Sequence, residues 1–175
     1  MEYPWYQAIH NTNDLQQGDF IPDCPIVVPP NTIKEDEETE IEIRQIDSVI
    51  LSQSCDLAND KVEIVLVCPF YPLNTFIESL PEEQTRNNKA KDKIKQNLKK
   101  GFLPGYHLLS KEHDFFDDHQ VVDFRNVYGI QKETLCKLSL KLGQRIRLLP
   151  PYREHLSQAF ARYFMRVGLP QDIIV

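Results

Sequence analysis

The fold is decided by the stretch TEIEIRQIDSVILSQSCDLANDKVEIVLVCPF, residues 39–70. Its first part alternates apolar and polar residues, with Ile41 and Ile43 on the face predicted to be buried, which is the pattern of a half-buried strand. Residues 48–52 (SVILS) and 62–70 (VEIVLVCPF) are apolar and rich in β-branched side chains, so each is predicted to be a buried strand. Short connections between the three favour antiparallel pairing, in a meander or a small barrel.

Prolines and turn residues mark the limits of these strands. Residues 55–61 (CDLANDK) are predicted to form a turn, and Pro69 and Pro72 are predicted to end the third strand. Upstream, residues 18–30 contain four prolines, so any strand there is expected at a sheet edge. The preceding segment, 1–17, is interpreted as an ordered arm or a short helix that aromatic side chains anchor to the body.

Two helices are predicted in the rest of the chain. Residues 81–100 begin with a proline and two glutamates and end in two lysines, which are helix start and stop signals. The C-terminal helix, 152–167, has one apolar face at three- and four-residue spacing, formed by Leu156, Ala159, Phe160, Tyr163, Phe164 and Val167. Strands are predicted at 121–130 and 144–149, whereas 132–142 fits either a helix or a strand. The expected fold is α+β: a small antiparallel β-barrel or curled sheet with a lysine-rich helical insertion and a C-terminal amphipathic helix.

Length and composition indicate a single domain, residues 1–175. The hydrophobic fraction of 41% and the charged fraction of 26% are ordinary for a globular protein. A net charge of −6 argues against a general nucleic-acid binder but leaves room for a local basic patch. The sequence has no signal-peptide pattern and no apolar run as long as a membrane helix. We therefore expect a cytoplasmic protein, with no membrane contact, whose four cysteines are free thiols.

The run SQSCD, residues 52–56, directly follows a predicted buried strand, so its side chains are expected at the end of a sheet. Cys55 would be a nucleophile if His107 lay close enough to take its proton and if Asp56, Asp19 or Asp123 oriented that histidine. A structural interpretation competes: the serine and aspartate side chains bond to the turn backbone, and the cysteine packs as a small apolar group. A third interpretation is a binding site without catalysis, formed by Ser52, Gln53 and Ser54.

Two basic segments are candidates for binding a ligand or a partner. The lysine-rich segment 86–100 is interpreted first as a solvated helix surface and second as a site for phosphate, nucleic acid or an acidic partner. The C-terminal helix combines arginines with tyrosines, which are frequent anchors of protein interfaces, so we expect it to bind another protein. The residues predicted to do so are Arg153, His155, Arg162 and Arg166. The alternative is that these arginines pair with the protein's own carboxylates.

Common catalytic and nucleotide-binding motifs are missing from the sequence. It contains no GxGxxG, GxxxxGK[ST], HExxH or GxSxG pattern, and six glycines leave little material for a phosphate-binding loop. Residues 113–119 place three aspartates between two histidines, but this spacing matches no structural metal site, and a solvated acidic turn is favoured. No metal and no cofactor are therefore expected.

Three short motifs resemble the small SH3-like barrel of the MazF/PemK toxins, over residues 18–73. Gly18-Asp19 opens a strand, residues 49–52 (VILS) form an apolar strand that ends in serine, and residues 65–69 (VLVCP) form one that ends in proline. The resemblance implies a barrel fold and a ribonuclease activity. Where that family usually carries an Arg-Pro pair, this sequence has Asp47-Ser48. The rest of the chain resembles an uncharacterised bacterial family.

These observations lead to three hypotheses about function. The first is a non-catalytic binding or assembly module of a bacterial multi-component system, of the toxin–antitoxin or phage-defence type, with another protein as its partner. The second is an enzyme, either a toxin-like ribonuclease or a hydrolase that depends on Cys55. The third is a nucleic-acid-binding regulator that uses the lysines of segment 86–100.

Overall fold

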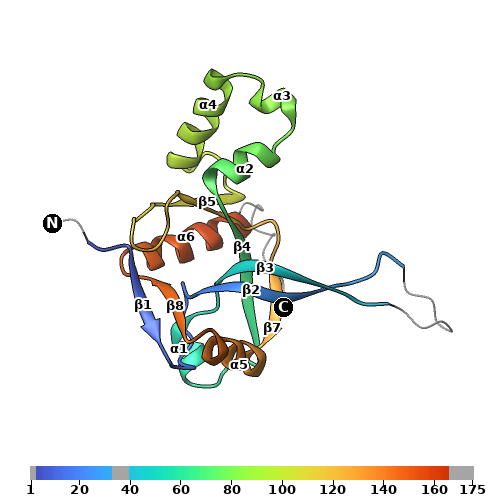
Figure 1. The fold of residues 1–175 in the computed structure, drawn as a ribbon, viewed down its shortest axis with the longest axis vertical. Helices are drawn as coiled ribbons and strands as arrows, with labels where there is room; N and C mark the ends of the chain where they lie inside the picture. Colours follow the sequence, from blue (N-terminus) through green and yellow to red (C-terminus); the bar gives the residue numbers. More distant parts are fainter. Residues whose placement is uncertain (1–2, 33–39, 166–175) are drawn as a thin grey trace, which may run out of the picture.

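The computed structural model describes residues 3–32 and 40–165 of an α+β protein (Figure 1). Its larger sheet is antiparallel and has six strands in the order β2-β3-β4-β6-β5, with β7 also paired to β4. These strands are β2 (Phe20–Val28), β3 (Glu42–Ile50), β4 (Ile64–Pro72), β5 (Tyr106–Leu109), β6 (Gln120–Asp123) and β7 (Tyr128–Gln131). A second, two-stranded sheet pairs β1 (Tyr6–His10) with β8 (Gln144–Leu148). Within the described ranges both sheets stay open, so the strands form no closed barrel.

Strand β4 is the centre of the larger sheet. One of its edges pairs with β3, and the other pairs first with β7 and then with β6. The prediction that Pro69 ends this strand is wrong. Pro69 lies between Ile64–Val67, which pairs with β7, and Phe70–Pro72, which pairs with β6. On the edge that carries β7 and β6 no residue is paired with Pro69, whereas on the opposite edge it faces Ser48 of β3. A residue without an N–H group is tolerated there because the gap between β7 and β6 needs no donor.

Residues 42–50 form one continuous strand, β3, instead of the two strands predicted. Its outer half pairs only with the edge strand β2, and together they project from the body as a two-stranded arm (Figure 1). Ile41 and Ile43 were predicted to be buried, but they are 63% and 60% exposed because they lie on this arm, beyond the core. Val49 and Ile50, at the inner end, are buried as predicted.

The described residues form six helices: α1 (Ser54–Ala58), α2 (Leu73–Ser79), α3 (Glu82–Thr85), α4 (Asn88–Lys99), α5 (Lys132–Leu142) and α6 (Tyr152–Phe164). Helix α1 replaces the turn predicted at 55–61, because buried Leu57 anchors it to the core. The predicted helix 81–100 is divided into α3 and α4, since the side chain of Asn87 accepts a hydrogen bond from the N–H of Ala90 and so begins a new helix. The ambiguous segment 132–142 is helical.

Of the two alternatives for the N-terminal segment, the ordered arm is correct and the short helix is wrong: it contains the strand β1, which buried Tyr6 anchors in the core. One further prediction differs from the structure. The strand predicted at 121–130 is two strands, because the carboxylate of Asp123 accepts hydrogen bonds from the backbone N–H of Arg125 (2.9 Å) and the side-chain amide of Asn126 (3.0 Å). These bonds close a turn between β6 and β7.

Three apolar clusters hold the elements together. Helix α6 packs through Leu156 where the two sheets meet, and helix α5 packs through Leu135 against the larger sheet. Helix α4 contributes Leu98 to a third cluster, with side chains of α2 and Val121 of β6. The predicted apolar face of α6 is therefore largely confirmed, although Phe164 is exposed and Val167 lies outside the described residues. No helix in the described part of the chain is long and apolar enough to cross a bilayer.

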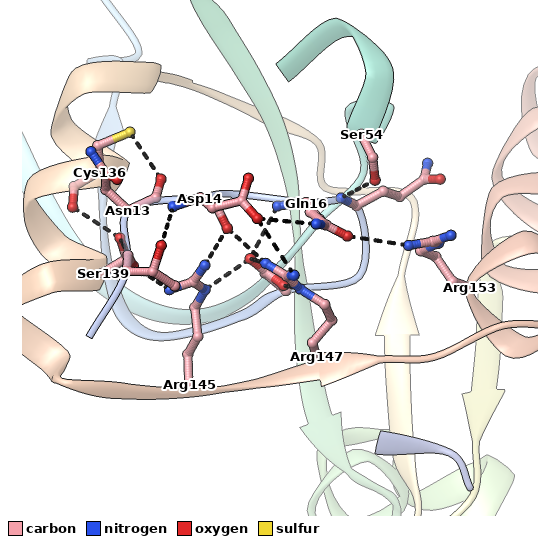
Figure 2. A network of polar contacts seen from close by, with 12 residues as sticks. Asn13, Asp14, Gln16, Ser54, Cys136, Ser139, Arg145, Arg147 and Arg153 are labelled. Carbon is pink, nitrogen blue, oxygen red and sulfur yellow. Dashed lines mark hydrogen bonds and ion pairs between the residues drawn. The ribbon is translucent and has the colours of Figure 1, made fainter. Parts of the chain in front are cut away.

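A buried cluster of charges joins β8 to the loop before β2. The carboxylate of Asp19 accepts hydrogen bonds from Nε of Arg145 (2.8 Å) and from Nε and Nη2 of Arg147. The two guanidinium groups also donate to the backbone carbonyls of Thr12 (2.6 Å) and Asp14 (2.7 Å). Figure 2 shows Arg145 and Arg147 side by side, reaching toward this loop. Because buried charges are costly unless they are paired, the cluster holds the loop in one position against the sheet.

Candidate functional site

A groove of about 670 Å³ lies between helix α4, strand β5 and helix α6. In Figure 1, α4 belongs to the group of helices at the top, α6 crosses the body, and β5 lies between them. A volume of this size is within the range of about 300–1,000 Å³ that is typical of ligand pockets. Apolar side chains from all three elements contribute to its lining, including Leu98, Leu108 and Ala159.

Two helices supply cationic side chains to this groove. His155, Gln158 and Arg162 of α6 all line it, because residues spaced by three or four positions lie on one face of a helix. Helix α4 contributes Lys95 and Lys99, which are four positions apart and so lie on one face, and the next residue, Lys100, lines the groove as well. The two basic segments singled out from the sequence therefore meet across one hollow.

The groove is positively charged on a negatively charged protein. No aspartate or glutamate belongs to its lining in the described part of the chain, although the whole chain carries a net charge of −6. Within the same residues, Arg162 forms no ion pair with a carboxylate. Charges of one sign gathered in a concave site attract ligands of the opposite sign.

Three histidines also line the groove. His107 of β5 lies against the ring of Phe124, with 6.2 Å between the ring centroids. Burial, together with the smaller effect of the nearby charges of His155 and Arg162, lowers the pKa of His107 to about 4, so this imidazole is neutral at pH 7. His119 accepts a hydrogen bond at Nδ1 from the N–H of Lys111 (3.2 Å), which leaves its Nε2 as the protonated nitrogen in the neutral form.

Two aromatic side chains stand in the lining. Trp5 stacks on Tyr152, with the ring centroids 3.5 Å apart and the planes 6° from parallel. Tyr106 packs edge-on to Phe76, and the guanidinium of Arg125 lies 4.5 Å from the centre of its ring. These contacts hold both rings in place, so the groove combines fixed aromatic surfaces with cations.

The proposed catalytic residues do not come together. Cys55 is exposed in α1, and its Sγ lies 3.7 Å from Oε1 of Gln53 and 3.6 Å from Oδ1 of Asp56. His107 lies in β5 and lines the cationic groove, which Cys55 does not. In Figure 1, α1 is near the bottom of the molecule, whereas β5 lies at the upper side of the body, below the helices α2 to α4. The environment of Cys55 therefore contains acceptors of hydrogen bonds and not the base that a thiol nucleophile needs.

The other polar residues of the SQSCD run stabilise the fold around them. Ser52 Oγ accepts a hydrogen bond from the N–H of Leu66 (2.8 Å), and Ser54 Oγ accepts one from the N–H of Gln17 (3.1 Å). Ser52 and Gln53 also line a second hollow, of about 700 Å³, beside the last turns of α6. The structural interpretation is correct that Ser54 bonds to the backbone, although the bond is to Gln17 and not to the turn. It is wrong for Cys55, which is exposed and does not pack as an apolar side chain. Ser52 bonds to the backbone and also lines the second hollow, which Gln53 lines as well.

The predicted interface residues of the C-terminal helix have different surroundings. Arg153 lies outside the cationic groove and contacts Glu154 (3.0 Å) and Gln16 (3.4 Å). His155 and Arg162 lie in the groove, and Arg166 is outside the described residues. The sequence offered no sign of His119 or Trp5 as groove residues, because neither lies in a basic segment or in a regular pattern.

A function for this protein has to be inferred from the geometry of the groove, because the comparisons with known proteins give no relative. Neither a protein-family model nor a curated protein matches this sequence. In the part of the chain that the structure describes, no group of three or more histidine, cysteine, aspartate or glutamate side chains is placed to hold a metal ion. What the groove offers chemically is therefore a set of lysine, arginine and histidine side chains with aromatic surfaces beside them.

Proposed function

We propose that this protein is a binding module that takes a single strand of nucleic acid into the groove between α4, β5 and α6. The observation that supports this most is the convergence of Lys95, Lys99, Lys100 and Arg162 on one groove whose described lining contains no carboxylate. Phosphate groups are the ligands that such a set of permanent cations favours.

The aromatic residues of the groove favour a nucleic acid over a free phosphate. Proteins that bind single strands combine a positively charged groove with aromatic rings on which bases stack. Trp5 and Tyr106 are the rings available here. A strand would follow the cations with its phosphates and place its bases near these rings.

The test is the binding of fluorescein-labelled single strands of DNA and RNA, measured by fluorescence anisotropy at several salt concentrations. Four neutralised phosphates predict a slope of log K against log [salt] of about −3, since each contributes about −0.7 for single strands. The variant Arg162→Glu is expected to bind more weakly at every sequence and, by losing one phosphate contact, to reduce the magnitude of the slope by about 0.7.

Lys141→Glu is the matched control for that experiment. It makes the same change in net charge at an exposed lysine of α5, which is not part of the groove lining. Equal losses of binding in the two variants would mean that only the overall charge matters, and the proposed site would be wrong. Binding by neither DNA nor RNA would contradict the proposal altogether.

A ribonuclease is the second candidate, favoured by the position of His107, His119 and His155 in the same groove. Histidines are the most frequent general acids and bases. Two histidines in one groove could act as the general base and the general acid when the 2′-hydroxyl of an RNA strand attacks the neighbouring phosphate. Incubation of end-labelled RNA with the protein and with His155→Ala tests this. Intact RNA under conditions where it binds would leave the protein a binding module.

A further inference from the structure

The outer half of β3 has one edge without a partner strand. Along its whole length β3 pairs with β2 on one side, but on the other side β4 pairs only with Ser48–Ile50. Residues 42–47 therefore have an open edge within the described part of the chain. An exposed edge with unpaired N–H and C=O groups is a template for another strand.

The backbone bonds of β3 show which residues face this open edge. Ile50 exchanges hydrogen bonds with Asp19 (2.9 Å) and Gly18 (2.8 Å), so its N–H and C=O groups point to the β2 side. Because these groups alternate in direction along a strand, those of Ile43 and Gln45 point to the open edge. The strand is regular between these residues, since the register shift of this pair lies in β2.

The side chains of the arm are apolar on one face and exposed. Val27 and Ile43 lie directly opposite each other in the β2–β3 register and are 56% and 60% exposed. Ile41, which is 63% exposed, follows on the same face two residues away. A two-stranded ribbon of this kind is only marginally stable in water by itself, so a third and fourth strand would stabilise it.

We propose that two copies of this chain pair β3 to β3 about a two-fold axis at Ile43, which joins their arms into one four-stranded antiparallel sheet. This register makes the strand complementary to itself. Ile43 lies opposite Ile43 of the second copy, and Glu42 lies opposite Arg44 in both directions. Opposite charges in directly facing positions stabilise a strand pair. The N–H and C=O groups of Ile43 point to the open edge in both copies, so the two facing residues can bond to each other across the axis.

The charge pattern identifies a second copy as the partner. Within one chain Glu42 and Arg44 already form an exposed ion pair, with Nε–Oε1 at 2.6 Å. Both side chains are therefore on the same face, as the facing pairs across the axis require. The pairing needs no residue of the cationic groove, so it is independent of the proposed nucleic-acid binding.

Charge-reversed variants test the register. Glu42→Lys and Arg44→Glu each place like charges opposite each other twice, so each variant is expected to weaken the dimer at least about tenfold. A mixture of the two variants restores both facing pairs between unlike copies, but it does not restore the ion pair within either chain. In sedimentation velocity, the wild type and the mixture of the two variants should therefore sediment as dimers. Each variant alone should sediment as a monomer of 20.5 kDa.

Disulfide cross-linking provides the second measurement, in a Cys55→Ser background that removes the exposed native thiol. Two facing residues of a hydrogen-bonded pair have Cα atoms about 5.5 Å apart, within disulfide range, so Ile43→Cys is expected to form a covalent dimer under mild oxidation. Ile41→Cys is the control, because in this register the two cysteines are offset by about 14 Å along the strands. A wild-type protein that stays monomeric at high concentration, or a dimer in which Ile41→Cys cross-links as fast as Ile43→Cys, would overturn the proposal.

Discussion

Replacing Asp19 by asparagine should strongly destabilise the protein. The substitution keeps the shape of the side chain and removes its charge. Asp19 is the partner of two arginines whose side chains are almost as buried as its own, with exposed fractions of 0% for Asp19, 1% for Arg145 and 9% for Arg147. In the variant both guanidinium groups stay in the interior, and the remaining carboxylate near them, that of Asp14, lies 3.9 Å from Arg147 and is 57% exposed.

The expected loss of stability follows from these contacts. Removing one partner of a buried ion pair typically costs about 3–5 kcal/mol, because an uncompensated charge stays buried. The whole free energy of unfolding of a domain is about 5–15 kcal/mol. For a chain of this size each kcal/mol lowers the melting temperature by about 2–4 °C, so we expect a decrease of about 6–20 °C.

Thermal unfolding followed by circular dichroism at pH 7 measures this effect. Asp60→Asn is the control: Asp60 also pairs with a cation, Lys132, but its side chain is 86% exposed. Exposed pairs contribute at most about 1 kcal/mol, so the control should melt close to the wild type. If Asp19→Asn melted no lower than Asp60→Asn, the buried charge cluster would not stabilise the fold.

Three further predictions concern a glycine, a histidine and the cysteines. Gly18→Ala should destabilise the protein by about 1–3 kcal/mol in urea unfolding, because Gly18 has φ +83° and a new Cβ would lie 3.0 Å from a buried leucine of β8; an unchanged midpoint would argue against this. His107 has a pKa of about 4 in the fold and about 6.5 when unfolded, so the unfolded state binds its proton more tightly. Stability is then complete above about pH 6.5 and falls by up to about 3 kcal/mol toward pH 4, a loss that His107→Gln should reduce. A thiol reagent should label exposed Cys55 first in the native protein and leave Cys24 and Cys68 unlabelled, because both are buried and burial raises the pKa of Cys24 to about 11; equal labelling of all three would contradict the described burial.

The elements that the sequence predicts well are those whose residues decide their own conformation. The C-terminal helix has an apolar face at helical spacing, and the strand at 144–149 alternates, so both are found close to where they are predicted. The prolines of 18–30 place β2 at a sheet edge as expected. In each case a local rule about spacing or about a missing N–H group is sufficient.

Other predictions fail because distant residues decide the outcome. Alternation correctly indicates a strand at Ile43, while Ile41 lies just before the first residue of β3. Alternation does not say which face meets the core, and here the arm carries both residues away from it. Helix α1 forms in a segment with turn residues because Leu57 is drawn into the core. Pro69 is tolerated inside β4 only because its neighbours change there.

The candidate site shows the same division. Composition and helical spacing are local properties, so the basic character of segment 86–100 and the shared helix face of His155 and Arg162 can be recognised without a structure. The positions of these two surfaces, which face each other beside β5 with His107 between them and Cys55 distant in α1, come from the fold. The positions of α4 and α6 relative to each other are set by long-range packing, because Leu98 and Leu156 are buried in different apolar clusters. No spacing along the chain encodes that arrangement.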